Sequence, residues 1–169
     1  MSAAPESATR ARRGLALVVI FAAAMGWLEG VVVVYIRSLL GLAHAETYPA
    51  AAELMARMRV LPWLVPTEQT REVATIVMLA VVAWMAAPRL RGRCGAFLVA
   101  FGVWDISYYI ALYALVRWPP SLGTVDLLFL IPPHPWWYQP VWVPVAISCG
   151  MIGAGAWMHR TAASPGHTT

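Results

Sequence analysis

An aspartate stands in the middle of a long apolar stretch, Phe101–Tyr113, and three tyrosines follow it along the chain. They come three, four and eight residues after Asp105: Tyr108, Tyr109 and Tyr113. At about 100° per residue these spacings place all four side chains on one helical face, with Trp104 pointing elsewhere. An ionisable group inside such an apolar segment is rare and faces a partner or a wet cavity. The pattern therefore predicts a buried polar site around Asp105.

Two further carboxylates lie in or at the edge of other apolar runs. Glu29 is about seven residues, or roughly 10 Å, from the end of the first run. Glu72 lies at the boundary of the second run, where Arg71 precedes it. Because charges in lipid must pair, protonate or meet water, we expect Glu29, Glu72 and Asp105 to converge in one outward-facing pocket. The candidate ligand-binding residues are Glu29, Arg37, Arg71, Glu72, Asp105, Tyr108, Tyr109 and Asp126.

The composition indicates that lipid surrounds most of this chain. The 169 residues are 60% hydrophobic and only 12% charged, whereas a soluble domain carries about a quarter charged residues. We predict an all-α integral membrane protein, a bundle of four transmembrane helices. The expected parts are a disordered cytoplasmic tail over 1–13, a single membrane domain over 14–160 with spans at about 15–36, 68–87, 95–116 and 141–158, and a disordered tail over 161–169.

Small residues recur at every fourth position in the first and fourth of these spans. The first set is Ala22, Gly26 and Gly30, and the second is Ala146, Gly150 and Ala154. Small side chains at this spacing allow two helices to approach closely. We therefore expect each set to pack against a neighbouring helix, with Glu29 facing protein next to the first seam.

Two short elements are expected between the spans. Tyr48–Arg59 has the pattern of an amphipathic helix in the outer loop, and Thr67 is a candidate N-cap for the second span, with Glu68 in its first turn. Ser121–Ile131 is too short to cross a membrane, and prolines follow it. We predict a short interfacial or re-entrant helix there, which carries Asp126 and covers the pocket.

The arginines indicate the orientation. With both termini in the cytoplasm, seven arginines lie inside and five outside, the direction of the positive-inside rule. The inside ones are Arg10, Arg12, Arg13, Arg89, Arg91, Arg93 and Arg160, and the outside ones are Arg37, Arg57, Arg59, Arg71 and Arg117. Because these basic residues gather at span ends, the net charge of +4 is not read as a nucleic-acid signal.

Four strings together resemble a group of small uncharacterised bacterial multi-pass membrane proteins. They are GWLEGVVVVYIR, REVATIVML, WDISYY and WPPSLGTVDLLFLIPP, and they cover most of the chain. The resemblance implies no function. With the arginine pattern, it places the chain in a bacterial inner membrane.

Three functions from different classes remain open. The first is binding or conduction of a proton, cation or small polar ligand in the pocket, since carboxylates and tyrosines supply hard oxygen ligands. The second is an accessory subunit of a membrane complex. The third, ranked last, is a membrane enzyme that uses paired carboxylates with His134 or His44, because no HExxH, GxSxG or CxxC motif occurs.

The expected partners are the lipid bilayer and either further copies of this chain or a partner membrane subunit. We expect no cofactor and no metal site, because none of the four histidines lies within a span and two cysteines do not make a zinc site. Whether Glu29 and Asp105 share one cavity discriminates ligand binding from a subunit role.

Overall fold

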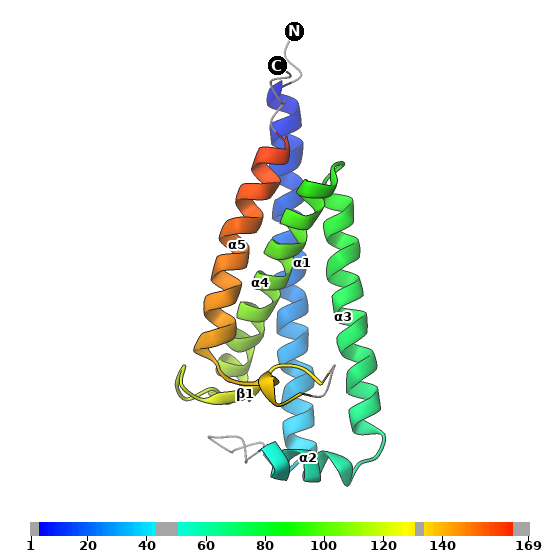
Figure 1. Cartoon of the computed structure of the whole chain (residues 1–169), viewed down its shortest axis with the longest axis vertical. Coiled ribbons are helices and arrows are strands. Elements are labelled where there is room, and N and C mark those ends of the chain that lie inside the picture. The colour runs from blue at the N-terminus through cyan, green and yellow to red at the C-terminus, as the bar shows by residue number, and fades with distance from the viewer. Residues whose placement is uncertain (1–3, 43–50, 131–133, 164–169) are drawn as a thin grey trace.

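The chain folds mainly into long helices. The computed structural model describes residues 4–42, 51–130 and 134–163. Within them four long helices alternate in direction, so that elements from the two halves of the chain lie side by side (Figure 1). These helices are α1 (Ala4–Leu39), α3 (Leu64–Ala86), α4 (Leu90–Val116) and α5 (Trp142–Ala163). Helix α4 is central and contacts the other three.

Three of the long helices have the length and apolarity needed to cross a membrane. The qualifying segments are Thr9–Leu39, Leu64–Ala86 and Leu90–Val116, each longer than the roughly 20 residues that a bilayer core requires. Helix α5 is 22 residues long and is not among the segments that meet both criteria. The predicted class, a helical membrane protein, is therefore supported by the length and composition of three helices.

The helix starts differ from those expected. Helix α1 begins at Ala4, so it runs through most of the segment predicted as a disordered tail. Helix α3 begins at Leu64, and the Thr67 hydroxyl donates to the carbonyl of Trp63 at 2.7 Å instead of capping. Thr67 as N-cap was therefore wrong. Pro66 fits inside the first turn because the first four N–H groups of a helix have no partner within it.

The expected amphipathic helix of the first loop is present as α2 (Ala51–Arg59). Its buried residues Leu54 and Met58 pack with Leu40, Leu64 and Leu130 in one hydrophobic cluster. The side that faces away carries an ion pair between Glu53 and Arg57 at 2.8 Å. Helix α2 thus closes one end of the bundle, while the expected extension to Tyr48 lies outside the described residues.

The helix predicted over Ser121–Ile131 was wrong. Strand β1 (Val125–Leu127) instead pairs antiparallel with β2 (Tyr138–Pro140), in a register that joins Asp126 to Gln139. A short 3-10 helix, η1 (Pro135–Trp137), precedes β2. Locally, the carboxylate of Asp126 accepts the next backbone N–H, from Leu127, at 2.8 Å, and such a bond competes with helical pairing.

The first small-residue seam packs as predicted. A Cβ at Gly26 would lie 2.3 Å from the carbonyl oxygen of Trp104, and one at Gly30 would lie 2.7 Å from the Cβ of Ala111. Both distances are far below van der Waals contact. The backbones of α1 and α4 therefore touch at positions that only glycine fits.

The second set does not pack on another helix of this chain, because Ala146, Gly150 and Ala154 are exposed. Helix α5 packs on α4 through another face, where Gly155 approaches the Gly95 carbonyl and the Ser148 carbonyl approaches Gly102. The glycines of α4, Gly95 and Gly102, allow close approach at one face of α5 only, so that face packs against α4. The spacing of small residues within α5 alone does not contain that information.

A buried histidine joins three helices at the opposite end of the bundle from α2. The ring nitrogens of His159 lie 3.0 Å from the Gly92 carbonyl oxygen and 3.2 Å from that of Ala11. This contact fixes the start of α1 and the start of α4 against the end of α5.

We predict opposite effects of alanine at two glycines. Gly26→Ala should lower the unfolding free energy by about 1–3 kcal/mol, because the added Cβ meets the α4 backbone. Gly150→Ala, where nothing lies within 4 Å, should be neutral or stabilising by up to about 1 kcal/mol through helix propensity. Thermal unfolding of both purified variants in detergent checks this. Equal losses of stability would contradict the observed helix contact.

Candidate functional site

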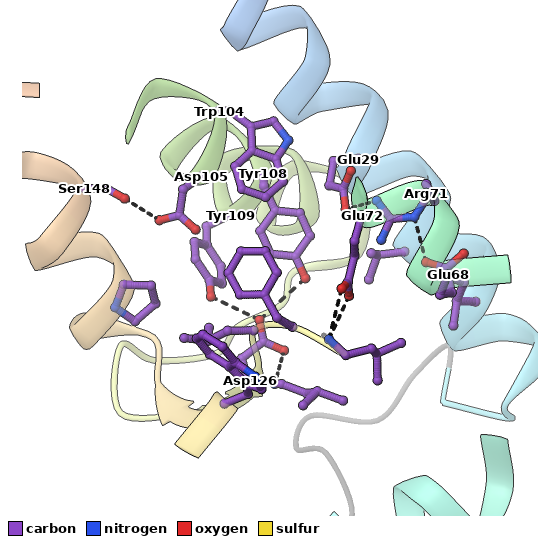
Figure 2. A pocket seen from close by; sticks show the side chains of 18 of the residues that line it. Glu29, Glu68, Arg71, Glu72, Trp104, Asp105, Tyr108, Tyr109, Asp126 and Ser148 are labelled. Atoms are coloured by element: carbon purple, nitrogen blue, oxygen red, sulfur yellow. Dashed lines mark hydrogen bonds and ion pairs between the residues drawn. The ribbon is translucent and has the colours of Figure 1, made fainter. Parts of the chain in front are cut away.

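A cavity of about 340 Å³ lies among the long helices near the end that carries α2 and the β1–β2 hairpin. Acidic residues dominate its polar lining. Five carboxylates and one arginine line it: Glu29, Glu68, Glu72, Asp105, Asp126 and Arg71. They come from α1, α3, α4 and the hairpin, so the folded bundle brings together charges that are far apart in the sequence (Figure 2).

Arg71 bridges two of the five carboxylates. Its Nη1 donates to Glu29 across the α1–α3 interface, and its Nε donates to Glu68 at 2.7 Å one helical turn away. The i, i+3 spacing on α3 places Glu68 beside Arg71. One guanidinium therefore serves two acids, and this corner of the cavity keeps a formal charge of −1.

Glu72 connects α3 to the segment that follows β1. Both carboxylate oxygens accept the backbone N–H of Leu130, at 2.9 and 3.1 Å. Among the described residues Glu72 makes no ion pair. Its carboxylate holds the segment after β1 against α3, and the positive charge of Arg71 acts on it without a direct ion pair.

Asp105 binds across the α4–α5 interface. The hydroxyl of Ser148, which is 2% exposed, donates to its carboxylate at 2.8 Å. Within the part of the chain that the structure describes, Asp105 also lacks an ion-pair partner. In the view of Figure 2 the ring of Tyr108 is drawn between the side chains of Asp105 and Glu72, and all three residues line the cavity.

Asp126 is the buried acid of the hairpin. The hydroxyls of Tyr109 and Tyr108 lie 3.0 and 3.5 Å from its Oδ2, and the Leu127 N–H donates to Oδ1. Burial raises the pKa of Asp126 to about 7, although the bonds from Tyr109 and Leu127 and the positive charge of Arg37 lower it. Nearby Asp105 raises it further. The hairpin thus carries a carboxyl group that titrates near neutral pH.

Aromatic rings form a continuous wall on one side of the cavity. Phe101 and Trp104 of α4 have ring centroids 5.2 Å apart, and Phe129 and Trp137 of the hairpin segment are also 5.2 Å apart. Phe101 and Phe129 join the pairs at 6.3 Å. All four rings line the cavity, so helix and hairpin share one aromatic surface.

Trp104 does not point where its position on the helix predicted. It was expected to point away from Asp105, yet it lines the cavity and is only 7% exposed. Neighbouring residues differ by about 100° around a helix, and an indole is wide enough to reach the cavity from that angle. Its ring N–H is buried and has no hydrogen-bond partner within the described residues.

The structure brings seven of the eight candidate residues to the cavity. The exception is Arg37, which is buried beside it with its guanidinium 4.7 Å from the ring centre of Trp118. Tyr113, expected on the same face as Asp105, is 52% exposed and lies under Arg117. His134 is exposed and caps η1, and His44 lies outside the described residues.

Sequence reasoning did not select Glu68, Ser148 or the aromatic wall as parts of the site. Glu68 shares a helical face with Arg71 and Glu72, and Ser148 is a polar residue within an apolar run, so the sequence contains a pattern that could have identified both. No such pattern identifies Phe129 and Trp137, because their contact depends on the β1–β2 pairing. Among the described residues, no three His, Cys, Asp or Glu side chains are placed to hold a metal ion.

Comparison with protein-family models, with curated proteins and with solved structures finds no match to this chain.

We predict that Asp126 makes stability depend on pH. Its pKa is near 3.9 in an unfolded chain and about 7 in the folded one, so its contribution is full below pH 4 and is lost as pH rises through 7. Raising the pH from 5 to 8 should lower the melting temperature of the wild type more than that of Asp126→Asn. Thermal unfolding across this range measures the difference.

The matched control is Glu53→Gln, which removes an exposed carboxylate of α2 and should keep the pH dependence of the wild type. Parallel curves for the wild type and Asp126→Asn would show that Asp126 does not titrate in this range.

Proposed function

We propose that this chain is a four-span membrane protein whose cavity binds or conducts a cation, a proton or a small polar ligand. The single observation that carries the proposal is the excess of acids over bases at the cavity, which five carboxyl groups and one arginine line, with Arg37 acting on Asp126 from beside it. Removing such charges from water costs several kcal/mol per ion when they lack a counter-charge. A positive ligand supplies the missing charge.

The surface of the helices supports insertion in a bilayer. Large apolar side chains point outward along α3 and α5, among them Val73, Val77, Val81, Ile147 and Trp157. Soluble monomers rarely expose contiguous apolar surface on this scale. Helix α5, at 22 residues, has the length of a fourth span.

The ends of the bundle support both termini in the cytoplasm of a bacterial inner membrane. The start of α1, the turn between α3 and α4 and the end of α5 lie at one end, and α2 and the hairpin lie at the other (Figure 1). The arginines at 10, 12 and 13, at 89, 91 and 93 and at 160 all belong to the first end. By the positive-inside rule the cavity then opens to the outside.

Glu29 and Asp105 line the same cavity, which favours ligand binding over a subunit that offers separate acidic faces to a partner. Conduction across the membrane with so few spans requires further copies of the chain. The exposed small residues Ala146, Gly150 and Ala154 of α5 support close helix contact between such copies.

We predict a ligand-dependent rise in melting temperature that requires Asp105. Thermal unfolding of the detergent-purified chain is followed against alkali and divalent cations, ammonium ions and small polar solutes at constant ionic strength. At least one cation should raise the melting temperature with concentration, as a ligand of the folded state must. Asp105→Asn, which can still accept from Ser148, should weaken this ligand about tenfold or more, whereas Glu53→Gln should not.

If no solute changes the melting temperature of the wild type, the binding function is wrong and a search for protein partners follows.

We also predict the topology. A reporter that fluoresces only in the cytoplasm should be active when it is fused to either terminus in a bacterial host. A phosphatase that folds only outside should be active when inserted at Val60, between α2 and α3. Phosphatase activity at one terminus with cytoplasmic fluorescence at the other would exclude four spans, and phosphatase activity at both termini would reverse the proposed orientation.

A further inference from the structure

We propose that the ligand of this cavity is an organic ammonium ion with an apolar body, which sits against the aromatic wall and is neutralised by Asp105 and Glu72. This inference rests on the proposed binding function and names its ligand class. It draws on the size of the cavity, on the rings that line it and on how its carboxylates are already engaged.

The size of the cavity favours a molecule over a bare ion. A volume of about 340 Å³ equals roughly eleven water molecules at about 30 Å³ each. It falls within the range of about 300–1,000 Å³ typical of small-molecule sites. An inorganic cation would leave most of this volume filled with water. Water in contact with the aromatic rings would not bury their apolar surface.

The aromatic wall supplies what an ammonium ion prefers. Phe101 and Trp104 meet edge to face, as do Phe129 and Trp137. Ring faces attract cations within about 6 Å of the centroid, and cages of such rings are a recurring way to bind substituted ammonium groups. Rings and carboxylates in one cavity recognise the charge and the apolar body of the ligand together.

Two carboxylates of the cavity make no ion pair within 4 Å among the described residues, Asp105 and Glu72. Asp105 accepts from Ser148 and Glu72 accepts from the Leu130 N–H, and both donors are uncharged. Arg71, which already pairs with Glu29 and Glu68, is the nearest positive charge to Glu72. An ammonium group placed near Tyr108, which lies between them in Figure 2, is attracted to both.

The same engagements disfavour a metal ion. Calcium takes six to eight oxygen ligands at about 2.3–2.6 Å, and magnesium demands a near-octahedral set. Here Asp105, Glu72 and Asp126 accept from donors on different elements, and Arg71 occupies Glu29 and Glu68. The part of the chain that the structure describes has no convergent group of three metal-ligating side chains. An ammonium ion needs no such convergence.

The test is isothermal titration calorimetry of the full chain in detergent with benzyltrimethylammonium, which has eleven non-hydrogen atoms and a permanent charge. Choline and its neutral isostere 3,3-dimethylbutan-1-ol form a second pair that differs only in charge. We expect saturable binding of both cations and at least tenfold weaker binding of the alcohol. Titration into detergent alone corrects for partition into micelles.

Variants separate the charge from the rings. Asp105→Asn should weaken benzyltrimethylammonium about tenfold, and Glu53→Gln, outside the cavity, should leave it unchanged. Trp104→Leu should weaken it about threefold to tenfold. Trp104→Phe, which keeps a smaller aromatic ring and removes the indole N–H, should stay within about threefold. If Trp104→Leu does not fold, Phe129→Leu makes the same comparison from the hairpin segment.

Four other results would overturn the inference. Equal binding of choline and the alcohol, or equal losses in Trp104→Leu and Trp104→Phe, overturns the ammonium site. No binding of either ammonium probe, together with an inorganic cation whose stabilising effect is lost in Asp105→Asn, overturns this inference and leaves the proposed function intact. No binding of any solute overturns both.

Discussion

Close backbone contact of α4 with α1 and with α5 is the constraint on which the rest of the structure depends. Gly26 of α1 lies against the Trp104 carbonyl, and Gly102 of α4 lies against the Ser148 carbonyl. Both contacts occur within one turn of Asp105. They bring α1 and α5 close enough that Glu29 and Ser148 reach the level of Asp105, and a side chain at either glycine would move the three elements apart.

Once the helices are fixed, the acids hold the cover over the cavity. Glu72 fastens the segment after β1 through the Leu130 N–H, and Asp126 joins the hairpin to Tyr109 of α4. Buried acids that remain without hydrogen bonds are costly, so these bonds stabilise both the acids and the loop. The same groups therefore shape the cavity and give it its charge.

The sequence allowed prediction of the acids but not of their surroundings. Depth along an apolar run and helical spacing are local properties, and they place Glu29, Glu72 and Asp105 toward one interior. The angle of a helical wheel ignores side-chain length, which is why Trp104 was misplaced. The hairpin and the packing face of α5 depend on contacts between distant segments, Asp126 with Gln139 and Gly95 with Gly155, which periodicity within either segment does not contain.

If the cavity binds a cation as proposed, the bond between the Leu130 N–H and Glu72 couples the order of the loop to the occupancy of the cavity. A cation that attracts the Glu72 carboxylate would weaken its hydrogen bond to the Leu130 N–H. A strong hydrogen bond to Leu130 would in turn weaken the attraction between Glu72 and the cation. Linkage makes these two effects equal in free energy. A substitution in the segment after β1 that alters this coupling would therefore change the affinity for the proposed cation and the effect of that cation on the loop by the same free energy.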